Sequence, residues 1–289
     1  MINLILAIIC SSLITILFRV GENRISSKSG IFISNYLVCI ILAKYYIGNV
    51  NLLNHQDGLA FAIGLGTISG ILFLVSFLLL QVNIAKNGMV MSSLFMKLGV
   101  VIPVIVAILI FRESPKLNQL TGILLAIISI ILINYGADDS SDNKKAATPT
   151  AKIGSGWLLI LLLILGGVSD CMINVYDKIG TPSLSDNFLF YVFFAALISA
   201  VVLQLIQKKR ISKWDIIFGA AIGIPNYYSS RFQLAALKTV PAVIVFPVYS
   251  VGTIVVISLV GLFFFSEKLE RNKLIAIITA ILALVLLNI

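Results

Sequence analysis

The chain has 289 residues, of which 60% are hydrophobic and 11% are charged, and its mean hydropathy is +1.08. Soluble domains carry about 25% charged residues, so this composition excludes an ordinary water-soluble fold. The net charge of +9 does not point to a nucleic-acid partner, because the cytoplasmic loops of membrane proteins also collect Lys and Arg.

Ten apolar runs follow one another along the chain, each long enough to cross a bilayer. About 20 helical residues span the hydrocarbon core, and helices satisfy their own backbone groups in lipid. We therefore predict an all-α membrane protein with ten transmembrane helices. The runs cover residues 2–19, 30–48, 59–81, 88–111, 118–136, 155–177, 187–206, 214–236, 240–265 and 271–289.

Basic residues favour one set of connections between these runs. The connections after odd-numbered runs hold fourteen of the 21 Lys and Arg residues, whereas those after even-numbered runs hold five. Loops rich in Lys and Arg stay in the cytoplasm. We therefore expect a multi-pass protein of the plasma membrane with both termini facing outward.

The fourth run, 88–111, carries a lysine near its middle. Lys97 lies four residues after Ser93, so both side chains share one helix face. A charge inside a membrane is costly and is a functional candidate by default. Lys97 and Ser93 are predicted to contact an anionic group of a substrate or a coupling ion, and the alternative is a structural ion pair between helices.

The sixth run carries an acidic stripe. Asp170, Asn174 and Asp177 recur at i, i+4 and i+7. Burial disfavours the charged form of a carboxylate, so Asp170, with Asn174 beside it, is the candidate for proton coupling. The alternative is a salt bridge from Asp170 to Lys97 or Arg231.

The eighth run is too polar to face lipid. Asn226, Ser230 and Gln233 form one stripe, and Arg231 lies beside it in the segment NYYSSRFQ. Such a surface lines a cavity or contacts other polar helices. We predict that Arg231, Asn226, Tyr227 and Ser230 contact the substrate, and the alternative is that they join helices.

The segment 137–154 is small, polar and mixed in charge, as is typical of a linker. It separates five runs in 1–136 from five in 155–289. Shifting the chain by 154 positions superposes FRESPKLNQLTGILL on FSEKLERNKLIAIIT, and such a fixed-offset match indicates duplication. The scarce residues that match are Glu113 with Glu267, Asn118 with Asn272, and Asn134 with Asn288.

An odd number of spans in each repeat makes the second copy enter the membrane from the opposite side. The halves are therefore predicted to be inverted repeats, an arrangement that recurs in secondary transporters. Glu113 and Glu267 lie where one helix ends and the next begins, and an acid is favourable near a helix N-terminus. We expect a structural role for both.

The chain resembles the drug/metabolite transporter superfamily in its ten-helix EamA-domain branch. The residues that carry the resemblance are Pro103, ten positions before Glu113, and Gly122 in the following run. The second copy keeps Glu267 but has Ile257 and Ala276 at the corresponding positions. The resemblance covers essentially the whole chain and implies transport of a small metabolite, without fixing which one.

These features favour a secondary transporter that works by alternating access. The chain has no GxxxxGK[ST] motif for nucleotide phosphates. No HExxH motif or catalytic Cys/His set indicates an enzyme, a metal or a cofactor. Lys97 and Arg231 favour an anionic or zwitterionic substrate, such as an amino acid or organic acid. The expected partners are this substrate, a coupling proton or ion and the lipid bilayer, and no nucleic-acid partner is expected. The alternatives are a non-transporting assembly or sensory protein and an exporter of lipophilic drugs.

Overall fold

The computed structural model describes residues 1–21, 24, 27–48, 57–87, 95–96, 98–135, 156–208, 210–264 and 271–288. These residues form ten α-helices and one 3-10 turn, η1, with no strand among them. The predicted linker 137–154 and the predicted site residues Ser93, Lys97 and Glu267 lie outside the described residues. The elements are α1 Ile2–Gly21, α2 Lys28–Ile47, α3 Leu59–Asn87, α5 Val101–Leu109, α6 Leu117–Tyr135, α7 Gly156–Ile179, η1 Pro182–Leu184, α8 Ser185–Gln207, α9 Lys213–Leu237, α10 Ala242–Phe264 and α11 Arg271–Asn288.

Six of the described helices are long and apolar enough to cross a membrane. They are α1, α2, α3, α7, the η1–α8 segment and α10. This confirms the prediction of an all-helical chain with the helices of an integral membrane protein. The unusually polar run at 214–236, which forms α9, is not among the six.

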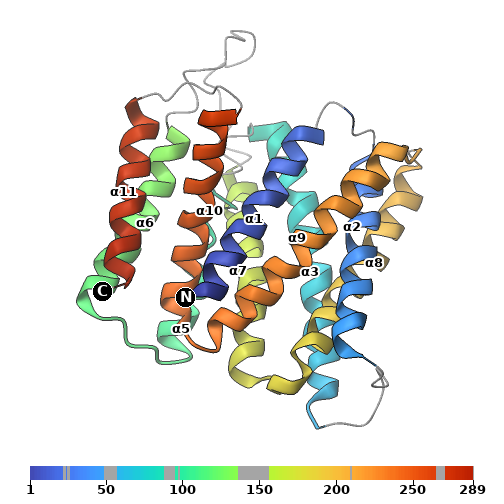
Figure 1. The fold of residues 1–289 in the computed structure, drawn as a ribbon, viewed down its shortest axis with the longest axis horizontal. Coiled ribbons are helices and arrows are strands. Elements are labelled where there is room, and N and C mark those ends of the chain that lie inside the picture. The colour runs from blue at the N-terminus through green and yellow to red at the C-terminus, as the bar shows by residue number, and fades with distance from the viewer. Residues whose placement is uncertain are drawn as a thin grey trace. The chain divides into compact units, whose positions relative to one another are not determined.

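The chain divides into two compact units (Figure 1). Unit 1 comprises Met1–Leu74 and Met172–Val240, and unit 2 comprises Val75–Cys171 and Pro241–Ile289. Each unit takes segments from both halves of the sequence, so the compact units do not coincide with 1–136 and 155–289. Helices α3 and α7 are each divided between the two units, because the boundaries after Leu74 and Cys171 fall inside them.

In unit 1, α9 packs along α1 and α2, and α2 packs along α8. Helices α2 and α8 are antiparallel: Ser29 near the start of α2 donates a hydrogen bond to Gln204 near the end of α8. About half-way along both helices, the ring centres of Tyr36 in α2 and Phe193 in α8 lie 6.3 Å apart. These contacts make one continuous helix layer of α1, α9, α2 and α8.

Helix α3 approaches α8 closely through two glycines. A Cβ added at Gly66 would lie 3.0 Å from the carbonyl oxygen of Phe188 and 2.9 Å from Cβ of Tyr191. One turn later, a Cβ at Gly70 would meet the carbonyl oxygen of Val192. The two backbones therefore touch because neither glycine has a side chain, as in GxxxG packing.

Helix α9 approaches α2 in the same way. A Cβ added at Gly219 would lie 2.5 Å from the carbonyl oxygen of Ile31 and 2.7 Å from Cβ of Ser34. A Cβ added at Gly223 would lie 2.7 Å from the carbonyl oxygen of Asn35. Both GxxxG pairs are thus close-packing points, as their spacing indicates.

In unit 2, α6 packs antiparallel against α11 and both contact α10 (Figure 1). The fourth apolar run is interrupted: Gly99 and Val100 form a turn before α5 begins at Val101. Ile102 donates to the carbonyl of Gly99 over 3.0 Å, a 3-10 type bond. Gly99 also lies against Gly167 of α7, since a Cβ on either would clash with the other backbone. We predicted one helix over 88–111, and the described part of that run has a break.

Candidate functional site

A half-buried ion pair joins α8 and α9 in unit 1. Arg231 Nε donates to Asp186 Oδ1 at 3.0 Å and Nη2 reaches Oδ2 at 3.5 Å. The side chains are 32% and 25% exposed. Two nearly parallel hydrogen bonds between a guanidinium and a carboxylate fix both groups in orientation. The charge of Arg231 is therefore balanced by a neighbouring helix within unit 1.

Three tyrosines surround this ion pair. The guanidinium carbon of Arg231 lies 3.5 Å from the centre of the Tyr46 ring, a cation–π contact. The hydroxyl of Tyr227 donates to Asp186 Oδ1 at 3.2 Å. The hydroxyls of Tyr46 and Tyr228 lie 3.0 Å apart. Together the five side chains tie α2, α8 and α9 at one point.

This cluster has a definite place along the helices. Asp186 lies in the first turn of α8, Tyr46 in the last turn of α2, and Arg231 in the last two turns of α9. We call this the ion-pair end of unit 1. An acid in a first helical turn interacts favourably with the helix dipole, which gives Asp186 a local reason for its position in addition to Arg231.

The other predicted contacts of α9 are also made between or within helices. Asn226 Nδ2 donates to Asn35 Oδ1 of α2 at 3.1 Å, and Cys39 donates to the carbonyl of Gly223. Ser230 Oγ donates to the Asn226 carbonyl at 3.3 Å. The structure thus brings Arg231, Asn226, Tyr227 and Ser230 together in unit 1, and their described contacts are those of interhelical polar packing.

Among the described residues of unit 1, two buried amide side chains have atoms without a hydrogen-bond partner. Asn174 of α7 is 0% exposed, and neither its Nδ2 nor its Oδ1 has a hydrogen-bond partner. Gln233 Nε2 of α9 is also buried without a partner. A buried polar group that lacks a hydrogen bond costs about 1–3 kcal/mol. Each of these unpaired groups therefore lowers the stability of the described conformation.

Asp170 and Asn174 share a stripe on α7 but differ in surroundings. Asp170 is half-buried and belongs to the part of α7 that lies in unit 2, whereas Asn174 belongs to unit 1. Arg231, which we weighed as a partner for Asp170, forms its ion pair with Asp186. The coupling role of Asp170 stays a prediction.

Glu113 holds the start of α10. Its Oε2 accepts a hydrogen bond from the backbone N–H of Val243, in the first turn of α10, at 3.0 Å. We expected Glu113 to act at a helix N-terminus, and it does so at α10 rather than at α6, which follows it in the chain. Arg112 before it adopts a positive φ of 53°, and that turn of the chain leads into Glu113.

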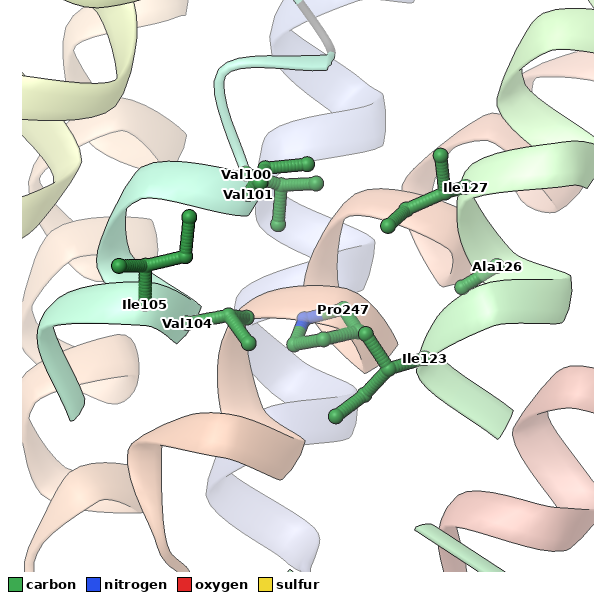
Figure 2. Close-up of a pocket in the computed structure, with 8 residues that line it drawn as sticks. All are labelled: Val100, Val101, Val104, Ile105, Ile123, Ala126, Ile127 and Pro247. Carbon is green, nitrogen blue, oxygen red and sulfur yellow. The ribbon is translucent and has the colours of Figure 1, made fainter. Parts of the chain in front are cut away.

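Unit 2 also contains an apolar cavity of about 150 Å³ (Figure 2). It lies among α5, α6 and α10, and Pro247 forms the α10 side of its wall. A proline inside a helix removes one backbone hydrogen bond, so α10 is locally weakened at this point. The described side chains that line the cavity are all apolar, and such a lining does not fit a charged metabolite. Its lining residues are Val100, Val101, Val104, Ile105, Ile123, Ala126, Ile127 and Pro247.

Sequence reasoning missed two members of the ion-pair cluster. Asp186 follows the short TPSLS connection and reads locally as a helix cap, and Tyr46 reads as an interfacial aromatic residue in KYYIG. Their approach to Arg231 depends on the packing of α2 and α8, which no local pattern encodes. Among the described residues, no group of three His, Cys, Asp or Glu side chains could hold a metal ion.

Comparisons with known proteins support the fold and leave the activity open. No family model matches the chain. An uncharacterized protein of Haemophilus influenzae is 21% identical over 292 residues, which cover 98% of this chain and 96% of that protein. A solved structure described only as "Crystal structure of protein" superposes with a TM-score of 0.75 at 10% identity and covers 99% of this chain and 94% of that one. The chain is therefore similar in fold to a solved protein over nearly its whole length.

Proposed function

We propose that this protein is a secondary transporter of the plasma membrane that moves a small anionic or zwitterionic metabolite by alternating access. The proposal includes membership of the drug/metabolite transporter superfamily, in its EamA-domain branch, and an architecture of two inverted five-helix repeats. The observation that carries it is a pair of helix crossings in unit 1 in which a carbonyl oxygen and a Cβ atom approach each of two paired glycines.

The two crossings are related by nearly constant offsets. Gly66 and Gly70 of α3 precede Gly219 and Gly223 of α9 by 153 positions. On the partner helices, Ile31 of α2 precedes Phe188 of α8 by 157 positions. The same offset relates Ser34 to Tyr191, Asn35 to Val192 and Val38 to Ala195.

In both crossings, the same kinds of atom approach the glycines. Gly66 faces the carbonyl oxygen of Phe188, and Gly219 faces that of Ile31. Gly70 faces the carbonyl oxygen of Val192, and Gly223 faces that of Asn35. The nearly constant offsets place this shared geometry at corresponding positions of the two halves. Because α2 and α8, which the offsets equate, are antiparallel, the equivalence favours inverted copies. Inverted copies can exchange conformations, so that a central site opens to either side in turn.

Two further observations favour transport over a purely structural role. The fourth run is broken at Gly99 and Val100, and interrupted helices are typical of binding regions in transporters. Asn174 is buried without a hydrogen-bond partner, a cost that a role in another conformation or with a ligand would explain.

The substrate class rests on Lys97. Arg231 is neutralised by Asp186, so the positive character that we predicted for the site depends on the lysine of the fourth run. A single positive charge favours a carboxylate-bearing metabolite over a lipophilic cation.

The test is transport into liposomes that contain the purified protein. We expect counterflow or uptake of a radiolabelled amino or organic acid, with at least a tenfold loss in Lys97→Gln. Lys116→Gln is the matched control, because Lys116 is exposed outside the helices. Movement of cationic dyes without any amino or organic acid would reject the substrate class, and the absence of transport in a broad metabolite screen would reject the proposal.

A further inference from the structure

The end of unit 1 opposite the ion pair is strongly basic. Here α1 and α8 finish and α2 and α9 begin, near the top of Figure 1. Segments 19–28 and 208–215 together contain seven Lys or Arg residues and two acids. We call this the basic end. Among the described side chains, its residues are Arg19, Arg24, Lys208, Arg210 and Lys213, with one acid, Asp215.

A buried carboxylate fixes the two connections of the basic end together. Asp215 is 0% exposed, and its Oδ2 accepts from the backbone N–H of Ser27 at 3.1 Å and of Ser212 at 2.8 Å. These two residues are the N-caps of α2 and α9. The acid therefore caps both helices at once. Four described cations at these two connections, Arg24, Lys208, Arg210 and Lys213, are exposed.

An arginine stacks on a tryptophan at this surface. The guanidinium carbon of Arg24 lies 4.7 Å from the centre of the Trp214 ring. Stacking on a ring leaves the N–H edge of a guanidinium available to a phosphate. Trp214 is 43% exposed, and Ile216 and Ile217, two and three residues later, are more than half exposed. An exposed tryptophan beside outward-facing isoleucines is typical of the membrane–water interface.

We propose that the basic end of unit 1 binds the phosphate headgroup of an anionic phospholipid. Arg24 and Arg210 are the hydrogen-bonding cations, Lys213 adds charge, and Trp214 anchors the glycerol region. Charge complementarity selects this occupant: Lys and Arg clusters directly beside membrane helices bind anionic lipids. At the ion-pair end, by contrast, the described arginine is neutralised by Asp186, and the connections at that end also carry Asp57 and Asp177.

The test uses the fluorescence of Trp214. The chain has two tryptophans, so Trp157→Phe leaves Trp214 as the single reporter. We compare its quenching by brominated phosphatidylglycerol and by brominated phosphatidylcholine in mixed vesicles. One cation near an anionic surface corresponds to about a fivefold preference, so at least a fivefold preference for the anionic lipid is expected. About 0.5 M NaCl should reduce it, because salt screens exposed charges.

Two triple variants locate the effect. Arg24→Gln with Arg210→Gln and Lys213→Gln should bring the preference close to one. Lys44→Gln with Lys178→Gln and Lys238→Gln, at the other end of unit 1, should leave it unchanged. An equal loss in both variants, or a preference that neither salt nor the first variant alters, would overturn the proposal. Displacement by millimolar inorganic phosphate would also overturn it, because the site would then be a general anion site.

Discussion

The ion pair between Arg231 and Asp186 allows a sharp test of whether Arg231 joins helices or is available to a substrate. Asp186→Asn keeps the shape of the side chain but removes its charge. The guanidinium, about two-thirds buried, then loses its counter-charge, and the hydroxyl of Tyr227 loses a charged acceptor. The contact of Arg231 with Tyr46 remains.

The expected magnitude follows from burial and geometry. An exposed ion pair contributes about 0.2–1 kcal/mol, whereas removal of one partner of a fully buried pair costs about 3–5 kcal/mol. The Arg231–Asp186 pair is partly exposed but is doubly hydrogen-bonded and supported by Tyr46 and Tyr227. We therefore expect Asp186→Asn to lower the free energy of unfolding by about 1–3 kcal/mol, within the range for hydrogen bonds to charged groups.

A double-mutant cycle isolates the pair. Unfolding of the wild type, Asp186→Asn, Arg231→Gln and the double variant is followed in mixed micelles by titration with dodecyl sulfate. A coupling free energy of about 1–2 kcal/mol is expected, because the double variant no longer leaves a charge unpaired. A coupling below about 0.5 kcal/mol, as in a surface pair, would refute this account. Arg231 would then be energetically independent of Asp186 and available for a ligand.

Three further predictions follow from the packing and the buried polar groups. Gly66→Leu and Gly219→Leu should each destabilise by at least about 1–3 kcal/mol through overpacking, whereas Gly64→Leu should be tolerated because nothing lies within 4 Å of its position; thermal unfolding in detergent distinguishes them. Glu113→Gln should cost about 1–2 kcal/mol, because it weakens a charge-assisted bond at the N-terminus of α10, and a variant as stable as the wild type would contradict that role. Asn174→Leu should raise or preserve the melting temperature while it abolishes transport, because the leucine relieves two unpartnered polar atoms; unchanged transport would remove Asn174 from the site.

Hydropathy and spacing were sufficient for the helices but not for their interruptions. The run 30–48 became α2 at Lys28–Ile47, and the polar run 214–236 became α9 at Lys213–Leu237. Both are long segments whose ends coincide with a change from apolar to polar residues. The break at Gly99 was missed because the hydropathy of the run stays high on both sides of it, although Gly99 and Pro103 are both residues that weaken helices.

The predicted site shows a second limit of sequence reasoning. The polar stripe of α9 predicted a surface that lines a cavity or contacts other polar helices, and its residue Asn226 contacts Asn35 of α2. Whether Arg231 carries an unbalanced charge depends on Asp186, which lies 45 residues away in the sequence. A local pattern locates polar groups, but only the packing of α8 against α9 decides whether a charge is neutralised.

The positions of the polar contacts in unit 1 have a consequence for any transport cycle. At the basic end, Asp215 ties the starts of α2 and α9, and at the ion-pair end, Arg231 and Asp186 tie α9 to α8. Between them, the glycine crossings bring backbones into direct contact, and close-packed interfaces switch between discrete arrangements rather than deform continuously. A layer fixed at both ends and in the middle is suited to move as one body. If the protein works by alternating access, as proposed, unit 1 would then move as one body, without bending of its helices.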